Sequence, residues 1–345
     1  MVGIIAGTRP EVIKLAPVAW ALHKEGIPFH MFLIQQHHEL LDATMNLLFG
    51  FEQSLTWIKL EKHPTPFNFA SDAFRNLPPY LKGEEIRSIV VQGDTMTAGF
   101  AAQIALFLRK PVIHVEAGVR SHTLEEPWPE EGIRRMIDHI ARVHFAPTLE
   151  TFSNLEKEGL SDNHWVGNTV ADALFTLKEK TRELPFRGEP YVIVFLHRWE
   201  NFERTGAFVE DFLRLYKGHV VVVTHPTTVY LQKYSERAHI LGPLPYEEFI
   251  FLLKQAKAII TDSGGAQEEA SLLGIPCLVF RQAPDRPESI LAGQACQIED
   301  AEQAVKLLNS SELETMRFPA RIYGDGESGP RIARILKKSY PHLLD

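Results

Sequence analysis

Hydrophobic and polar positions follow two spacing patterns that alternate along this chain. Short runs rich in Val, Ile and Phe, such as VGIIAG at 2–7, precede longer segments whose apolar residues recur every three or four positions, such as PEVIKLAPVAWALHKEG at 10–26. The first pattern predicts buried strands and the second predicts helices. We expect strands at 2–7, 29–35, 86–94, 111–118, 144–148, 191–197, 219–225, 257–262 and 275–281. Strands that alternate with helices predict parallel sheets with right-handed crossovers.

The alternation of strand and helix patterns is interrupted in the middle of the chain and then starts again. Residues 170–190 have the pattern of a helix followed by a connection that contains Pro and Gly, and the apolar runs resume at 191. The length of 345 residues also exceeds the ~100–200 residues of one ordinary domain. We therefore expect two doubly wound α/β domains, residues 1–170 and 171–327, the second beginning with the linker helix. A last helix within 328–345 is expected to return to the first domain.

Composition and charge exclude several classes of function. Apolar residues make up 45% and charged residues 23% of the chain, which is typical of a soluble globular enzyme. The net charge of −8 argues against binding to nucleic acid or to an anionic membrane. We find no signal-peptide pattern and no run of ~18 apolar residues. Cys277 and Cys296 lack metal-ligand spacing, so we expect no metal and a cytoplasmic protein.

Polar residues after the first strand indicate an anionic ligand. Ligands of doubly wound sheets bind at the carboxyl ends of the strands, so polar residues at those ends are candidates for a site. Arg9 and Lys14 follow the first strand and would place positive charge there. A capped helix with a solvated lysine explains the same residues equally well. The segment is not a GxGxxG fingerprint, so no dinucleotide cofactor is indicated.

Three carboxylates follow strands or open a helix in the first half. Asp94 ends the run VVQGD, Glu116 ends HVE, and Glu130 follows the prolines of PWPEE. Asp94 and Glu130 each have a structural alternative, because an acidic residue favours a helix start, and a merely structural role is also open for Glu116, which has no obvious helix to cap. Three acids in one crevice would raise one another's pKa, which is how a general acid or base is tuned to neutral pH.

The second half contains a candidate diphosphate site. TDSGG at 261–265 follows the apolar run AKAIIT, where backbone N–H groups at a helix start can bind phosphate. We expect a diphosphate to be surrounded by His197, Arg198, Ser263, Gly264, Gly265 and Arg286. Glu268 and Glu269 could accept hydrogen bonds from a ribose. A lone histidine at a strand end, such as His197 or His225, is more often structural.

Several long motifs together resemble one known family. GTRPEVIK, QGDT, HVEAGVRS, PWPEE, GNTVADAL, TDSGGAQEEA and YGDG resemble, in this order, the non-hydrolysing UDP-N-acetylglucosamine 2-epimerases. The resemblance implies the GT-B architecture, two Rossmann-like domains facing a deep cleft. It also implies an isomerase that needs no cofactor and interconverts UDP-N-acetylglucosamine and UDP-N-acetylmannosamine for surface polysaccharides. In that reaction UDP is eliminated to leave 2-acetamidoglucal and then adds back.

The resemblance also implies roles for individual residues and a homodimer. Asp94, Glu116 and Glu130 match the acid/base carboxylates, and His197 matches a histidine near the leaving diphosphate. The substrate-binding positions are matched by Arg9, Lys14, Phe249, Ser263, Gly264, Gly265, Glu269 and Arg286.

This chain departs from the family pattern at Gln92, at His122-Thr123 and at Leu244, and its segment QQHHELL at 35–41 is similar to one involved in activation by substrate.

Three alternative functions remain open. A hydrolysing 2-epimerase would release free N-acetylmannosamine. A GT-B glycosyltransferase would need an acceptor pocket, and a sugar-nucleotide sensor would need no acid and base.

Overall fold

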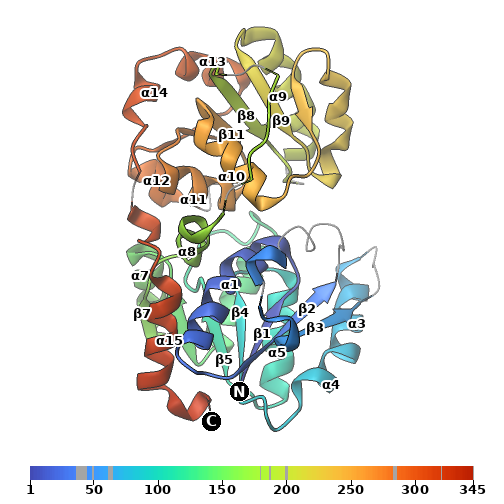
Figure 1. Cartoon of the computed structure of the whole chain (residues 1–345), viewed down its shortest axis with the longest axis vertical. Coiled ribbons are helices and arrows are strands. Elements are labelled where there is room, and N and C mark those ends of the chain that lie inside the picture. The colour runs from blue at the N-terminus through green and yellow to red at the C-terminus, as the bar shows by residue number, and fades with distance from the viewer. Residues whose placement is uncertain are drawn as a thin grey trace. The chain divides into compact units, whose positions relative to one another are not determined.

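The computed structural model describes residues 1–35, 45–48, 50–60, 65–178, 180–185, 188–198, 201–282, 286–319 and 321–344. The chain divides into two compact units (Figure 1). Unit 1 is Met1–Thr176 with Tyr323–Asp345, and unit 2 is Leu177–Ile322. Most of the QQHHELL segment lies outside the described residues.

Unit 1 contains a parallel sheet that, in the described residues, has seven strands in the order β3-β2-β1-β4-β5-β6-β7. The strands are β1 (Val2–Ala6), β2 (Phe29–Gln35), β3 (Leu55–Lys59), β4 (Ser88–Gln92), β5 (Val112–Val115), β6 (Val143–Ala146) and β7 (Asn163–Trp165). The α-helices are α1 (Arg9–Lys24), α3 (Pro66–Asn76), α4 (Pro78–Leu81), α5 (Met96–Phe107), α6 (Glu130–Ile140), α7 (Leu149–Lys157), α8 (Thr169–Thr176) and α15 (Ser328–Ser339). Short 3₁₀ turns are η1 (Met45–Leu48), η2 (Glu52–Ser54) and η6 (Pro341–Leu343).

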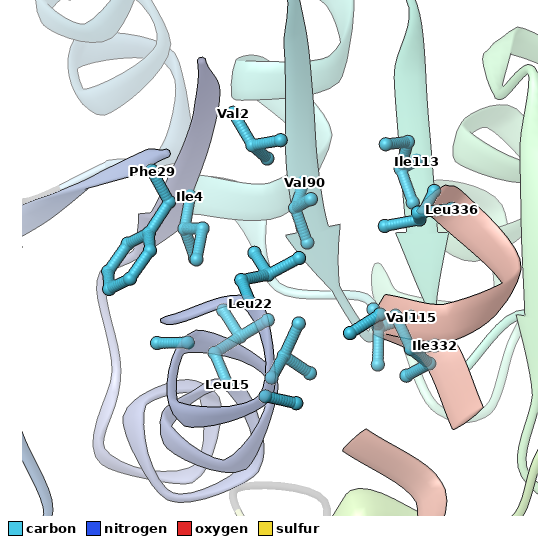
Figure 2. Packing of buried hydrophobic residues seen from close by; sticks show 14 of the residues in the cluster. Val2, Ile4, Leu15, Leu22, Phe29, Val90, Ile113, Val115, Ile332 and Leu336 are labelled. Carbon is cyan, nitrogen blue, oxygen red and sulfur yellow. The ribbon is translucent and has the colours of Figure 1, made fainter. Parts of the chain in front are cut away.

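The sheet of unit 1 is covered on both faces, because neighbouring residues of a strand point to opposite sides. Ile4 of β1 belongs to a core with Leu15 of α1 and Leu336 of α15 (Figure 2). Ile5, the next residue, belongs to a second core with Ala101 of α5. This two-sided burial explains why the strands appear in the sequence as continuous apolar runs.

The C-terminal helix α15 packs on α1 and α8 within unit 1. A Cβ atom on Gly329 would lie 2.7 Å from the carbonyl oxygen of Pro17, so only glycine permits this close approach. Asp172 of α8 accepts hydrogen bonds from the backbone N–H groups of Ser328 (3.1 Å) and Gly329 (2.8 Å). Helix α8 therefore lies in unit 1, whereas we expected it to open the second domain. Val170, Ala171, Ala173 and Leu174 of this helix are buried, α8 packs on α1 and α15, and the expected boundary at residue 170 falls inside it.

Unit 2 contains a second parallel sheet, whose described strands follow the order β10-β9-β8-β11-β12-β13. They are β8 (Tyr191–Phe195), β9 (His219–Val223), β10 (His239–Leu241), β11 (Ala258–Thr261), β12 (Cys277–Val279) and β13 (Ala295–Gln297). The helices are α9 (Phe202–Leu215), α10 (Tyr246–Gln255), α11 (Gly264–Leu273), α12 (Pro287–Leu291), α13 (Ala301–Leu308) and α14 (Glu312–Thr315), with 3₁₀ segments η4 (Pro226–Tyr234) and, at the boundary of the units, η5 (Arg321–Tyr323).

Each sheet reverses its strand order at one point, between β1 and β4 in unit 1 and between β8 and β11 in unit 2. The expected doubly wound arrangement is thus confirmed in both units. Ligands of such sheets bind beyond the carboxyl ends of the strands that flank this reversal. The residues that follow β1 and β4, and those that follow β8 and β11, are therefore the first places to look for a site.

Candidate active site

The turn from β1 into α1 is held by a buried carboxylate. Glu11 accepts hydrogen bonds from the backbone N–H groups of Gly7 (2.9 Å) and Thr8 (2.6 Å). Its other oxygen accepts from the hydroxyl of Thr95, at 2.6 Å, just beyond β4. Burial raises the pKa of Glu11, although these hydrogen bonds act in the opposite direction. Glu11, which sequence reasoning did not select, joins the ends of the two strands that flank the reversal. Arg9 is the first residue of α1 and is half-buried.

Lys14 and Glu116 form a buried ion pair, although 102 positions separate them in the chain. Lys14 lies on α1, and Glu116 directly follows β5. The side-chain amide of Gln92, the last residue of β4, donates to the same carboxylate oxygen at 2.9 Å. The departure at Gln92 therefore supplies a direct partner for Glu116. Of the other departures, His122 is exposed and Leu244 is buried.

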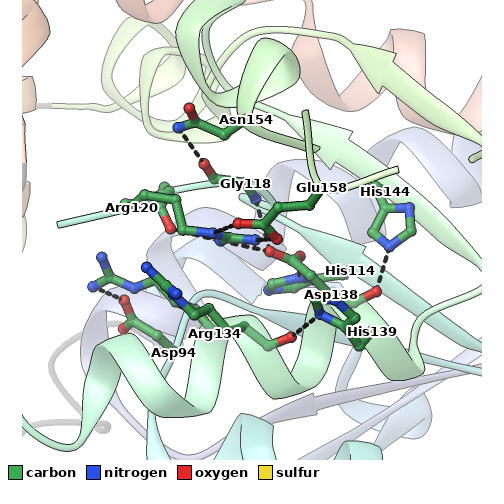
Figure 3. Close-up of polar contacts among 12 residues, drawn as sticks. Asp94, His114, Gly118, Arg120, Arg134, Asp138, His139, His144, Asn154 and Glu158 are labelled. Atoms are coloured by element: carbon green, nitrogen blue, oxygen red, sulfur yellow. Dashed lines mark hydrogen bonds and ion pairs between the residues drawn. The ribbon is translucent and has the colours of Figure 1, made fainter. Parts of the chain in front are cut away.

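Asp94 pairs with Arg134 of α6 (Figure 3). The N-cap of α5 is Thr95 and not Asp94, because the Thr95 side chain accepts from the backbone N–H of Ala98 at 3.1 Å. Glu130 is the first residue of α6 and lies one turn before Arg134, so both residues are on one face of that helix. Unit 1 thus places Asp94 and Glu116 at the ends of neighbouring strands and connects Asp94 to the helix of Glu130.

In unit 2 a buried carboxylate holds the loop that carries His197. Asp262, directly after β11, accepts from the backbone N–H groups of His197 (2.9 Å) and Arg198 (3.1 Å). The side-chain amide of Asn201 donates to Asp262 at 3.2 Å and to the carbonyl of Phe280 at 2.9 Å. Asp262 is fully buried, and burial raises its pKa against the effect of these hydrogen bonds. Sequence reasoning missed Asp262, although its place directly after a strand marked it as a candidate.

The ring of His197 lies in a positively charged environment. Burial, reinforced by Arg198, His225 and Arg281, lowers the pKa of His197 to about 3. The imidazole is therefore neutral at neutral pH. The ring centroid of His225 lies 5.1 Å from that of His197. This cluster is suited to an anion, and His225 and Arg281 belong to it although neither was selected as a site residue.

Helix α11 begins where the diphosphate was expected. Ser263 is its N-cap and accepts from the backbone N–H of Ala266 at 3.4 Å. Gly264 and Gly265 form its first turn.

The other expected residues of unit 2 lie on or beside these elements. Arg286 donates to Glu268 of α11 at 2.5 Å, and both side chains are buried. Glu269, the next residue, is also buried. The ring of Phe249 of α10 lies tilted against that of Phe195, with 5.4 Å between the centroids, and the Phe195 centroid lies 4.9 Å from that of His197.

No group of three or more His, Cys, Asp or Glu side chains with the arrangement of a metal site occurs among the residues that the structure describes. Across those same ranges, the structure has no helix with the length and apolar character needed to cross a membrane.

Comparisons with known proteins give a consistent result. The family model described as UDP-N-acetylglucosamine 2-epimerase matches residues 21–337. The UDP-N-acetylglucosamine 2-epimerase of Campylobacter jejuni is 32% identical, over 97% of this chain and 97% of that protein. The crystal structure of Methanocaldococcus jannaschii UDP-GlcNAc 2-epimerase in complex with UDP-GlcNAc and UDP is 30% identical with a TM-score of 0.84, and the match covers 97% of this chain and 99% of that one. MurG of Acinetobacter baumannii, 16% identical with a TM-score of 0.58 over 98% of this chain and 100% of that one, shares the fold alone.

Proposed function

We propose that this chain, which belongs to the UDP-N-acetylglucosamine 2-epimerase family and has the GT-B architecture, interconverts UDP-N-acetylglucosamine and UDP-N-acetylmannosamine without hydrolysing them. One observation carries the proposal beyond family membership. Unit 1 presents two paired carboxylates, Asp94 and Glu116, at neighbouring strand ends, together with Glu130 on the helix that holds Asp94. A protein that only binds a nucleotide has no need for such a set.

Unit 2 is the proposed nucleotide-binding unit. The backbone N–H groups at the start of α11, with Ser263, Gly264 and Gly265, suit the diphosphate because a helix N-terminus favours anions. Arg281 and Arg286 add positive charge, and Arg286 is already oriented by Glu268. We assign the uracil to the neighbourhood of Phe249 and the ribose hydroxyls to Glu269. A bound diphosphate would offset the positive surroundings of His197, raise its pKa and let it donate a hydrogen bond to the leaving phosphate.

Unit 1 is the proposed acid/base unit. One carboxylate removes the proton from C2 of the sugar, the C2–H electron pair forms the C1=C2 bond, and the C1–O pair leaves with UDP. UDP then adds back to C1 while a proton returns to the opposite face of C2, so no electrons are gained or lost overall. Lys14 and Gln92 both donate to Glu116 and orient its carboxylate. We assign the two proton transfers to Asp94, Glu116 and Glu130 as a set.

Proton NMR of UDP-N-acetylglucosamine incubated with the protein in D₂O tests the proposal. We expect UDP-N-acetylmannosamine to appear with deuterium at C2 and no added cofactor. Free N-acetylmannosamine would instead identify a hydrolysing enzyme. A substrate that binds but keeps its C2 proton would leave a transferase or a sensor. The matched variant Glu116→Gln should keep UDP affinity and lose epimerisation.

We also propose that the protein acts as a homodimer, as the family resemblance implies. Phe67 and Phe74 lie seven residues apart on α3, and Phe100 and Phe107 lie seven apart on the adjoining α5. The ring centroids of Phe74 and Phe107 lie 6.2 Å apart. Phe67 and Phe107 are 83% and 71% exposed. The exposed rings of Phe67 and Phe107, beside the partly buried Phe74 and Phe100, are suited to a protein contact, and we assign this face to a second copy of this chain. Analytical ultracentrifugation of the wild type and of Phe107→Ser tests this assignment, and an unchanged mass would contradict it.

A cytoplasmic location is proposed as well, because Cys277 and Cys296 are both free cysteines, and burial raises the pKa of each thiol. Cell fractionation tests it, and recovery of the protein outside the cytoplasm would contradict it.

A further inference from the structure

A buried carboxylate on α6 contacts the chain on both sides of Glu116. One oxygen of Asp138 lies 2.6 Å from Nδ1 of His114, two residues before Glu116. The other oxygen accepts from the backbone N–H of Gly118 at 3.2 Å and pairs with Arg120 at 2.8 Å, two and four residues after Glu116. Asp138 therefore holds both ends of the short segment that presents Glu116 (Figure 3).

The same carboxylate is connected to the segment of Asp94. Nε2 of His114 lies 2.8 Å from the carbonyl oxygen of Gly93, the residue before Asp94. Both ring nitrogens of His114 thus face oxygen atoms, one of the Asp138 carboxylate and one of the Gly93 carbonyl. His114 and Asp138 are fully buried, and water cannot replace these contacts. A change at Asp138 is therefore transmitted to the segments of both Glu116 and Asp94.

Helix α6 brings these supports together on one face. Glu130, Arg134 and Asp138 are spaced four residues apart, which places them in one row along the helix. Glu130 is itself an acid of the proposed site, Arg134 pairs with Asp94, and Asp138 holds the segment of Glu116. We propose that Asp138 is a positioning residue for epimerisation, and that the Glu130–Arg134–Asp138 face sets the relative placement of the three acids. The inference rests on the proposed function, which it deepens.

The conformation of Glu116 explains why such support is needed. Glu116 has φ 68°, in the left-handed region that residues other than glycine rarely adopt. Residues in this region persist only where their surroundings hold them there. At Gly118, with φ 82°, a Cβ atom would lie 2.1 Å from the carbonyl oxygen of Thr151, so only glycine fits against α7 here. The contacts of Asp138 on either side of Glu116 supply the constraint.

The charges around Asp138 are fully paired. Burial by itself would raise the pKa of Asp138, but His114 and Arg120 outweigh it and hold that pKa below its usual range. Arg120 also donates two hydrogen bonds to Glu158, at 2.7 and 2.6 Å. Asn154 donates to the carbonyl of Gly118 at 3.0 Å. A buried network that is fully satisfied is rigid and specifies one geometry.

Asp138→Asn tests the inference in the full-length protein. The amide keeps the shape of the side chain but removes the charge that pairs with His114 and Arg120. We expect kcat for epimerisation to fall by at least about tenfold, with the Kd for UDP unchanged within about twofold, because UDP binds unit 2. If Asp138 only stabilised the fold, the substitution would reduce the yield of folded enzyme but would leave kcat per folded active site unchanged. Asp162→Asn is the matched control. Asp162 also lies in unit 1 and accepts a hydrogen bond from Tyr340, but it directly precedes β7 and so lies at the amino ends of the strands, away from the proposed site.

A folded Asp138→Asn variant with wild-type kcat would overturn the inference. If that variant does not fold, Glu158→Gln and Asn154→Ala weaken the same network from its outer side. A lower kcat with unchanged UDP affinity in these two variants would support the inference, and wild-type kcat in both would overturn it. A wild-type protein without epimerase activity would refute the proposed function instead. In that case a crystal structure of a folded network variant decides the inference, which requires Glu116 to be displaced.

Discussion

Replacing Asp262 tests how unit 2 presents its anion site. Asp262→Ala removes a fully buried side chain that accepts from two part-buried backbone N–H groups, those of His197 (2.9 Å) and Arg198 (3.1 Å). Leaving a buried donor unsatisfied costs about 1–3 kcal/mol, and since these two donors are part-buried we expect the lower end, about 2 kcal/mol for both together. Asp262→Asn keeps one acceptor oxygen, and we expect it to lose about half as much.

Asp262→Ala should also weaken UDP binding. Without Asp262 the loop of His197 and Arg198 is no longer held in place, so part of the binding free energy is used to order it. Since each 1.4 kcal/mol is tenfold in affinity, we expect the Kd of Asp262→Ala to rise by about 10- to 100-fold, with Asp262→Asn between it and the wild type. Isothermal titration with UDP measures the affinity, and urea unfolding measures the stability of unit 2.

The matched control for this pair of measurements is Asp300→Ala. Asp300 is the exposed N-cap of α13 in the same unit and accepts from the backbone N–H of Gln303 at 2.9 Å. Its loss should cost about 1 kcal/mol of stability and leave UDP affinity unchanged. The reasoning is refuted if Asp262→Ala binds UDP as the wild type does, or if Asp300→Ala weakens binding equally.

Three more changes test other parts of the molecule. Lys14→Met removes the ammonium group from Glu116, so kcat should fall at least about tenfold at unchanged UDP affinity; wild-type turnover in the NMR assay would contradict this. Gly118→Ala adds a Cβ 2.1 Å from the carbonyl of Thr151 at φ 82° and should cost at least about 1–3 kcal/mol in thermal unfolding; an unchanged Tm would count against the packing described. His197 has its pKa lowered from 6.5 to about 3, so on acidification the unfolded chain binds a proton that the folded chain does not. Stability should fall by about 1.4 kcal/mol between about pH 7.5 and 5.5, and this part of the loss should be absent in His197→Gln; identical pH dependence of both proteins would exclude it.

The strands that sequence patterns predicted are those inside the sheets. Expected runs at 2–7, 86–94, 191–197 and 257–262 are found as β1, β4, β8 and β11, which flank the two reversals of strand order. The four strands that were not predicted, β3, β7, β10 and β13, are the edge strands of the two sheets. An edge strand has a neighbour on one side only and is partly exposed, as the burial of β7 shows. It therefore needs no continuous apolar run, and its pattern does not differ from that of a loop.

The candidate site was predictable to a similar extent. Asp94, Glu116, His197 and Ser263 could be selected because each directly follows an apolar run, and the structure places all four beyond strand ends. Their catalytic and binding roles remain predictions. The supporting residues Glu11, Asp138 and Asp262 were not selected. Two of them lie within helices, where their sequence pattern is that of any polar helical residue.

By itself, the sequence determined the two doubly wound units, the family and the positions at which chemistry can occur. These depend on local periodicity and on motifs, which extend over a few residues at a time. Only the tertiary structure decided which residue holds which. Lys14 meets Glu116 across 102 positions, and Asp262 meets His197 across 65. Such pairs form where the ends of parallel strands converge after the chain has closed, and no local pattern records that convergence.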